Sequence, residues 1–241
     1  STLTGNPATV RSTPGTYIGD PVTGTRRYTP PEGRDVIERH LTEWERFIYS
    51  DHGLDPLVLM AATHYQFEAI HPFYDGNGRT GRILNILLLL QEDVLDLPVL
   101  YLSGYIVQNK SSYYRLLRAV TADNAWEDWI LFMVDAVASS ARATADLIDE
   151  LTRAQAETRD HIRELGIQPA AELSELLYMQ PYVRIADLPA KDLATRQTAS
   201  IWLSSLAQAG ILEEQKAGRT KIFLNTAALE ILTGAGTTTR P

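Results

Sequence analysis

The residues best suited to chemistry gather within residues 71–82, which read His-Pro-Phe-Tyr-Asp-Gly-Asn-Gly-Arg-Thr-Gly-Arg. His71 stands at the start of this segment. Because an imidazole titrates near neutral pH, it can take a proton from an attacking hydroxyl. Asp75 offers a carboxylate, and Mg²⁺ in proteins often binds one or two carboxylates together with phosphate oxygens and water. The segment therefore predicts a base and a metal ligand at one site.

The same segment also predicts a site for a polyanion. We expect a helix to start near Asn77, and a helix N-terminus supplies unpaired N–H donors and a partial positive charge. Gly76 and Gly78 let these donors approach a ligand because no Cβ stands in the way. Arg79 and Arg82 are three residues apart, so one helical face would direct both guanidinium groups at the same phosphates. Base, carboxylate and anion cradle together indicate a phosphoryl- or nucleotidyl-transfer centre.

Each of these features has a common structural explanation when it stands alone. A histidine before a proline is more often a loop residue than a base, Gly-Asn-Gly is often only a turn, and paired arginines often face solvent. Phe73 is most simply a core anchor. A zinc site at His64, Glu68 and His71 is disfavoured because the spacing differs from the His-Glu-x-x-His pattern of zinc proteases. The joint occurrence of the features in one short segment favours the catalytic interpretation.

Residues 71–82 closely resemble the signature of the Fic (filamentation induced by cAMP) family, His-Pro-Phe-x-Asp/Glu-Gly-Asn-Gly-Arg-x-x-Arg, and every specified position is matched. The flanking residues 64–70, 101–103, 109 and 113–115 are also typical of the family, and the resemblance spans roughly residues 10–230. It implies AMPylation, the transfer of AMP from ATP to a Ser, Thr or Tyr hydroxyl of a target protein with release of pyrophosphate.

The resemblance implies a role for each matched residue. His71 would be the general base, and Asp75 would hold Mg²⁺ on the α- and β-phosphates of ATP. The remaining matched residues would bind the nucleotide through backbone donors, an amide and two guanidinium groups; they are Gly76, Asn77, Gly78, Arg79 and Arg82. Candidates for an adenosine pocket, which an aromatic core explains about equally well, are Tyr105, Asn109 and Tyr113.

Two comparisons within the family refine this expectation. The related Doc kinases carry lysine in place of the second motif glycine, so Gly78 favours nucleotide transfer over phosphate transfer. Many members carry an inhibitory helix with the pattern Ser/Thr-x-x-x-Glu-Gly/Asn, which this sequence does not match; residues 29–33 are one residue too short. In the winged-helix type that helix precedes the flap. We therefore expect that it was removed or that a partner supplies it, and its absence would leave Arg82 free.

The elements expected around the site form an all-α core (the Fic helical fold) with a small β-hairpin flap, plus a C-terminal winged helix-turn-helix domain. Turn signals predict the hairpin within residues 1–34, and in similar proteins a target segment docks on this flap by strand pairing. A long periodic segment from Trp126 predicts one long helix or two abutting ones, which Gly166 and Pro169 end. The predicted domains are residues 1–34, 35–165 and 166–241.

Composition limits the classes of function. The chain has 241 residues, a net charge of −8 and no cysteine. Its longest apolar run is far shorter than the ~20 residues of a membrane helix, so we expect a cytoplasmic protein without a membrane partner. From residue 161 onward eight basic side chains balance eight acidic ones. A balanced domain lacks the basic surface that DNA binding needs, and it suits homodimerisation or target docking at least as well.

The alternative function is a non-catalytic winged-helix DNA-binding regulator with a nucleotide-sensing Fic core. The intact His71 argues against this alternative, because a sensor needs no base.

Overall fold

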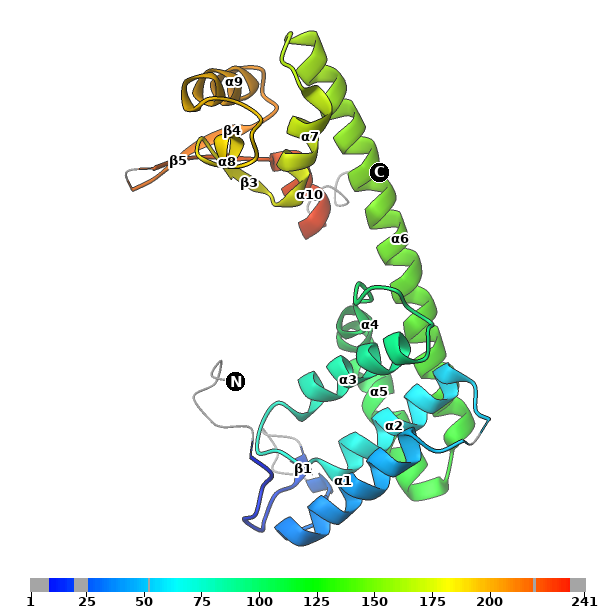
Figure 1. Ribbon diagram of the computed structural model, residues 1–241. Helices are drawn as coiled ribbons and strands as arrows, with labels where there is room; N and C mark the ends of the chain where they lie inside the picture. The colour runs from blue at the N-terminus through cyan, green and yellow to red at the C-terminus, as the bar shows by residue number, and fades with distance from the viewer. Residues whose placement is uncertain (1–8, 20–25, 52, 219, 235–241) are drawn as a thin grey trace. The chain divides into compact units, whose positions relative to one another are not determined.

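The structure is a computed structural model that describes residues 9–19, 26–51, 53–218 and 220–234 (Figure 1). The chain forms two compact units, Ser1–Thr144 and Ala145–Pro241. The division falls within helix α6 (Trp126–Glu164), a single helix of 39 residues, so one long helix forms rather than two abutting ones. The domain boundary predicted after residue 165 falls at the end of this helix and stays a prediction.

The first unit contains a short hairpin and a set of packed helices. Its elements are β1 (Ile18–Gly19), β2 (Arg26–Tyr28), α1 (Arg34–Ile48), α2 (Pro56–Ile70), α3 (Asn77–Gln91), α4 (Leu102–Gln108), α5 (Lys110–Asp123) and the first part of α6. Strands β1 and β2 pair antiparallel, with Ile18 opposite Tyr28. These strands match the predicted flap, and the turn expected at residues 20–25 lies outside the described residues.

Helix α2 is central to this unit because its apolar side chains point to several sides. Met60 and Ala61 are fully buried, and α2 packs against both α1 and α3. Trp129 of α6 is also fully buried and donates its Nε1–H to the Ala61 carbonyl at 2.8 Å. The indole therefore ties α6 to α2 through both packing and a hydrogen bond.

Local sequence signals define where α2 begins and ends. Asp55 is the N-cap, its Oδ1 accepts the Leu57 N–H at 2.8 Å, and Pro56 occupies the first helical position. The helix continues to Ile70, whose buried side chain anchors the last turn in the core. Helix α3 begins at Asn77, as predicted, so residues 71–76 form the connecting loop.

The second unit combines small helices with a three-stranded sheet. Besides the end of α6, its elements are α7 (Ala170–Met179), β3 (Tyr182–Arg184), α8 (Asp187–Ala190), α9 (Arg196–Gln208), β4 (Glu213–Ala217), β5 (Thr220–Leu224) and α10 (Thr226–Thr233). The sheet order is β3-β5-β4, and both pairs are antiparallel. Leu173, Leu203 and Phe223 are fully buried in its core. The order of elements from α7 to β5 is the one expected of a winged helix-turn-helix.

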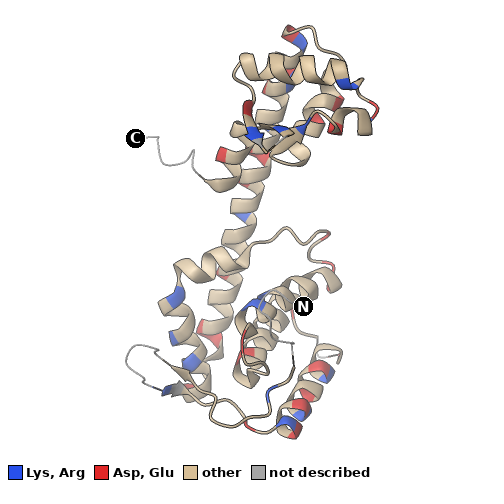
Figure 2. Cartoon of the chain, turned by 90° about the vertical axis from the view of Figure 1, so that its left-hand side faces the viewer, with Lys and Arg blue, Asp and Glu red and all other residues tan. Residues whose placement is uncertain are grey.

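The surface of the second unit carries both signs of charge. Lys and Arg are interspersed with Asp and Glu along its helices and strands (Figure 2). Lys221 Nζ lies 2.6 Å from Glu214 Oε1, and Arg184 Nη2 lies 3.2 Å from Asp187 Oδ1. Basic side chains that pair with neighbouring carboxylates offer little free charge to a phosphate backbone.

None of the helices among the described residues combines the length and the apolar character needed to cross a membrane.

We expect Asp55→Ala to lower the free energy of unfolding of the first unit by about 1 kcal/mol, because it removes the acceptor of the Leu57 N–H at the start of α2. Asp55→Asn keeps a side-chain acceptor and should have little effect. Urea unfolding followed by circular dichroism measures both variants. Equal losses in the two would mean that the cap hydrogen bond contributes nothing.

Candidate active site

His71 lies where helix α2 ends. Its N–H donates to the Phe67 carbonyl at 3.0 Å, and its backbone adopts φ 48° and ψ 59°, in the left-handed region. Residues other than glycine seldom adopt this conformation, although histidine does so more readily than most, and it is common where a helix terminates. The left-handed turn ends the helix and begins the loop of residues 71–76.

The imidazole of His71 is half-buried, and its Nδ1 is buried without a hydrogen-bond partner. Burial lowers the pKa of His71, because a desolvated ring disfavours the charged form. The nearby Glu68 carbonyl partly opposes this decrease in pKa, and the positive charge of Arg11 adds to it. The lowered pKa keeps the imidazole neutral at pH 7, the form that can accept a proton.

The side chain of Asn77, the first residue of α3, holds the loop of residues 71–76 through hydrogen bonds. Its Oδ1 accepts the Phe73 N–H at 2.8 Å, and its Nδ2 donates to the Phe73 carbonyl at 2.7 Å. The Phe73 ring lies 6.3 Å from the Phe67 ring, centroid to centroid, and Val10 forms an isolated antiparallel bridge with Phe73. Phe73 is thus a packing anchor, and the Asn77 amide is engaged at both its oxygen and its nitrogen.

The N-terminus of α3 has no side-chain cap. Its N-cap residue is Gly76, whose φ of 85° favours glycine. The backbone hydrogen bond of this first turn runs from the Thr80 N–H to the Gly76 carbonyl at 2.9 Å. The three N–H groups that precede Thr80 in the helix, those of Asn77, Gly78 and Arg79, therefore lack acceptors within the helix. They are donors of the kind that bind an anion at a helix N-terminus.

Asp75 and Arg79 form an exposed pair beside this helix start. Arg79 Nη2 lies 3.2 Å from Asp75 Oδ2, and the side chains are 60% and 70% exposed, respectively. An exposed pair of this kind contributes only about 0–1 kcal/mol, so a ligand can replace either partner. Within the described ranges, His, Cys, Asp and Glu side chains form no group of three that could hold a metal ion. A divalent ion at Asp75 would therefore need further oxygens from a bound nucleotide, which is how Mg²⁺ commonly binds.

Arg82 lies beside the first turn of α3 and is half-buried. Its Nε donates to Ser103 Oγ of α4 at 2.8 Å. A Cβ placed on Gly78 would lie 3.1 Å from Arg82 Nη1 and 3.6 Å from Glu68 Oε1. The absence of a side chain at position 78 thus leaves the room that the guanidinium group occupies.

A buried carboxyl group lies behind Arg82. Glu68 is 7% exposed, and its Oε1 has no hydrogen-bond partner. Burial raises the pKa of Glu68 to about 7, and the Arg82 charge only partly offsets this. Sequence reasoning gave Glu68 no role of its own, although a carboxylate within the apolar run of α2 was a usable signal.

A second buried polar group, His64, neighbours Glu68. Its Nε2 lies 2.9 Å from the Tyr113 hydroxyl, and burial, followed by the charge of Arg82, lowers the pKa of His64 to about 4. A Cβ on Gly81 would lie 2.9 Å from Glu68 Oε1 and 3.1 Å from His64 Cε1, so a side chain at this position would have to displace one of these two groups. Tyr113, a weak candidate for an adenosine pocket, thus has its hydroxyl in the core beside His64.

The other adenosine-pocket candidates are partly engaged within the fold, since Asn109 Nδ2 donates to the Tyr105 carbonyl at 2.9 Å. Arg11 is a residue that the sequence did not reveal. It is fully buried and donates to the His71 carbonyl. A single arginine in a segment rich in Thr and Pro offers no pattern from which this contact could be foreseen.

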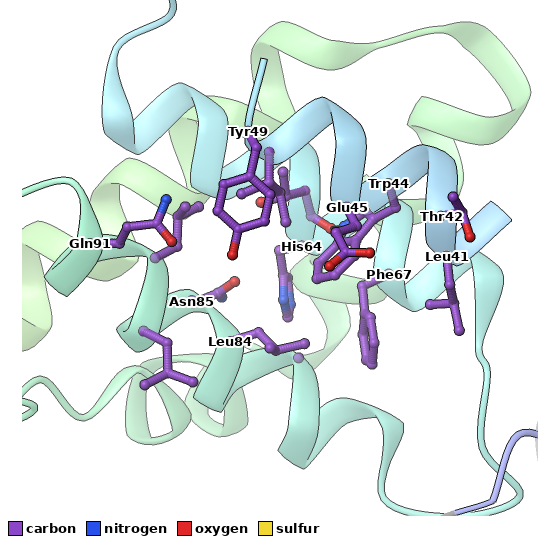
Figure 3. A pocket seen from close by; sticks show the side chains of 15 residues that line it. Leu41, Thr42, Trp44, Glu45, Tyr49, His64, Phe67, Leu84, Asn85 and Gln91 are labelled. Atoms are coloured by element: carbon purple, nitrogen blue, oxygen red, sulfur yellow. Dashed lines mark hydrogen bonds between the residues drawn. The ribbon is translucent and has the colours of Figure 1, made fainter. Parts of the chain in front are cut away.

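A cavity of about 470 Å³ lies between α1, α2 and α3 (Figure 3). Its lining includes Trp44, Phe67 and Leu84, with His64 and Asn85 contributing polar groups. None of the candidate site residues of the loop lines it. Among residues 71–82 the lining includes Gly81, which lies on α3 behind the candidate site residues.

Two family models match the chain. Residues 6–89 match the Fic/DOC family, and residues 155–228 match the family described as "Protein adenylyltransferase SoFic-like, C-terminal domain". The first match includes the whole loop and the start of α3. The chain therefore carries a Fic/DOC family domain, followed by a domain that matches the SoFic-like C-terminal family.

Curated Fic relatives resemble part of this chain. Proteins named "Protein adenylyltransferase Fic" from Drosophila melanogaster and Drosophila willistoni are 28% identical over 156 residues and 29% identical over 160 residues, respectively. The alignments cover 61% and 63% of this chain and 30% of each relative, so the chain spans about a third of their length. A crystal structure of a Fic family protein from Desulfovibrio desulfuricans G20 has a TM-score of 0.46 and 21% identity, covering 83% of this chain and 58% of the other.

We expect Glu68→Gln to stabilise the first unit in a pH-dependent way. The folded-state pKa of Glu68, about 7, lies above its ordinary value of 4.5, so the folded protein binds this proton more tightly than the unfolded chain does. The contribution of Glu68 to the free energy of unfolding is therefore fully present below pH 4.5. It is lost as the pH rises through about 7. The advantage of the Gln variant should be small near pH 5 and reach at most about 3 kcal/mol near pH 8. Urea unfolding at the two pH values measures it, and a constant difference would contradict the raised pKa.

We expect Gly81→Ala to destabilise the Fic domain by about 1–3 kcal/mol, because the added Cβ must displace Glu68 or His64 in a packed interior. Gly104→Ala is the matched control. There the added Cβ would lie 3.1 Å from the Tyr101 ring, which is 70% exposed and free to turn, so the higher helix propensity of alanine should leave stability unchanged or improved. Thermal unfolding compares the two variants. Similar shifts of the melting temperature would show that Glu68 and His64 can move to accommodate the added Cβ.

Proposed function

We propose that this chain is a Mg²⁺-dependent protein adenylyltransferase that transfers AMP from ATP to a Ser, Thr or Tyr hydroxyl of a target protein. The observation that carries the proposal is the loop of residues 71–76. It joins a half-buried, neutral imidazole to an uncapped helix N-terminus, with Asp75, Arg79 and Arg82 around it. The names of the curated relatives support the same activity.

The nucleotide phosphates bind at the first turn of α3. The N–H groups of Asn77, Gly78 and Arg79 donate to phosphate oxygens, while the guanidinium groups of Arg79 and Arg82 bind the β- and γ-phosphates. Arg79 exchanges its exposed ion pair with Asp75 for the phosphates. Arg82 keeps the hydrogen bond from its Nε to Ser103 Oγ while its Nη atoms contact the ligand. Fixed donors of this kind stabilise the charge that develops on the leaving pyrophosphate. The Asn77 side chain supports the site by holding Phe73.

His71 acts as the general base. Its neutral imidazole takes the proton of the target hydroxyl as the oxygen forms a bond to the α-phosphorus of ATP. The bond between the α-phosphorus and the bridging oxygen breaks, and pyrophosphate leaves with that electron pair. The products are the AMP ester of the target, pyrophosphate and a proton held on His71 that solvent then removes. The lowered pKa of His71 keeps the base available at neutral pH.

Asp75 is the residue that would hold Mg²⁺ together with phosphate oxygens. Its exposed carboxylate, two residues before α3, fits an ion that takes few protein ligands. When bound, Mg²⁺ supplies positive charge that neutralises the phosphates. The flap strands β1 and β2 are the proposed docking place of the target segment, which would add a strand by backbone pairing.

Incubation of the chain with Mg²⁺ and ATP labelled at the α-phosphate, alone and in a lysate, tests the activity. We expect His71→Ala to reduce labelling by about 100-fold or more, because it removes the general base, while the melting temperature stays near that of the wild type. His40→Ala is the control, since His40 lies on α1 outside the loop of residues 71–76, with its Nδ1 3.4 Å from Glu43 Oε2. Equal labelling by wild type and His71→Ala would refute the base assignment.

ATP labelled at the γ-phosphate distinguishes the two transfer chemistries. Label retained on the target from the α-position but not from the γ-position indicates AMP transfer, and the reverse indicates a kinase. The alternative of a DNA-binding regulator gains no support from the charges of the second unit, whose wing lysine Lys221 pairs with Glu214. It would require DNA binding that depends on nucleotide and salt, without transferred AMP.

A further inference from the structure

Arg11 is a cation in the interior of the Fic domain. Its side chain is 0% exposed, and its Nη1 is buried without a hydrogen-bond partner. Burial lowers the pKa of Arg11, and the titratable groups of Glu32, Tyr74 and Tyr28 partly oppose this decrease in pKa. A guanidinium group nevertheless keeps its proton in proteins. A buried charge of this kind is costly, so the groups that it contacts are the guide to its role.

Those contacts are backbone carbonyls, at the end of α2, in the loop and at Pro31 before α1. Arg11 Nε donates to the His71 carbonyl at 2.7 Å, and Nη2 donates to the Ile70 carbonyl at 3.2 Å and to the Pro31 carbonyl. The Arg11 backbone N–H donates to the Pro72 carbonyl at 2.9 Å. One residue thus contacts three consecutive peptide units, those whose carbonyls belong to residues 70, 71 and 72.

The neighbouring residues keep Arg11 in register with the loop. Val10 pairs with Phe73, and the Tyr74 hydroxyl accepts the N–H groups of Ser12 at 2.9 Å and Thr13 at 3.0 Å. The segment before the flap therefore runs along the loop from residue 72 to residue 74. Because hydrogen bonds hold the backbone on both sides of Arg11, the Cα atom from which its side chain extends has a fixed position.

The contacts matter because the last carbonyls of a helix have no partners within it and carry partial negative charge. His71 also holds a left-handed backbone that the surrounding structure must enforce. A donor on the His71 carbonyl fixes the plane of the peptide that follows His71. Donors on the Ile70 and Pro72 carbonyls restrain the peptides on either side. Together they set the direction of the Cα–Cβ bond from which the imidazole projects.

We propose that Arg11 is a positioning residue for His71, holding the end of α2 so that the imidazole meets the target hydroxyl beside the nucleotide. The proposal rests on the function proposed above for His71. Arg11 does not touch substrate; it acts through the backbone. Its charge also disfavours protonation of the ring, since it contributes to the lowered pKa of His71.

The test compares Arg11→Met, Arg11→Lys and Trp44→Phe in the whole chain. Met keeps the length of the side chain without its charge or donors, and Lys keeps the charge but cannot contact several carbonyls in a planar fork. Trp44→Phe is the matched control because Trp44 Nε1 donates to the Thr63 carbonyl, also on α2, at 2.8 Å, far along the helix from His71. All three variants lose hydrogen bonds to the backbone of the same unit, so a purely structural role would affect them alike.

We expect Arg11→Met to lower kcat for AMP transfer by about tenfold or more, because a displacement of about 1 Å of a catalytic group can cost 100-fold. The KM for ATP should stay close to the wild-type value, since the phosphate-binding residues are untouched. The acid limb of the pH–rate profile should move to higher pH, because removal of the positive charge lets the pKa of His71 rise. Arg11→Lys should lower kcat with little shift of that limb, and Trp44→Phe should affect only the melting temperature.

An NMR titration of the His71 ring nitrogens separates this proposal from the proposed function, because it needs no AMP transfer. A raised pKa of His71 and an altered ring environment in Arg11→Met, with wild-type values in Trp44→Phe, would support the positioning role even if the chain labelled nothing. Unchanged kcat, pH profile and ring signals in a folded Arg11 variant would overturn it. If Arg11→Met does not fold, Arg11→Lys decides by kcat and ring signals in the same way.

Discussion

The two hydrogen bonds between the Asn77 amide and the Phe73 backbone hold the end of one helix close to the start of another. Helix termini have opposite partial charges, and residues 71–76 bring the negative end of α2 near the positive end of α3. The C-terminus of α2 and the N-terminus of α3 differ in their hydrogen-bond partners. The carbonyl end of α2 is satisfied from within by Arg11 and by Tyr28, whose hydroxyl donates to the Ala69 carbonyl at 2.9 Å. The amide end of α3 has no side-chain cap and so remains suited to an anionic ligand.

The interior beneath the loop is unusually polar for a helical core. Glu68, His64 and Arg11 all have a buried atom without a hydrogen-bond partner. Such groups lower stability, because desolvation is not offset by new hydrogen bonds. Two of them, Glu68 and His64, lie against α3 close to Gly81, and the third contacts the loop itself. The cost is thus concentrated around the elements that carry the candidate site, a place where proteins commonly tolerate local destabilisation.

Much of this arrangement could be read from the residues before any coordinates. The motif segment predicted a helix start near Asn77, where α3 begins, and the periodicity from Trp126 predicted a long helix. The site residues of the loop came from a single contiguous segment, so their proximity followed from sequence alone. Arg11 lies 60 residues from His71 in the chain, and a contact at that separation depends on tertiary packing that no local pattern encodes. The hydrogen bonds between the Asn77 side chain and the Phe73 backbone were also not visible in the motif.

Helix α6 supplies Trp129 and Met133 to the core of the Fic domain and Ile162 to the core of the second unit. Most side chains between residues 141 and 153 are exposed, so this middle stretch contributes little to either core. An isolated helical stretch of this length is only marginally stable in water, and its hydrogen bonds persist because both ends are anchored. Loss of either anchor would shorten the ordered helix from that side. The thermal stabilities of the first and second units are therefore coupled through a shared backbone.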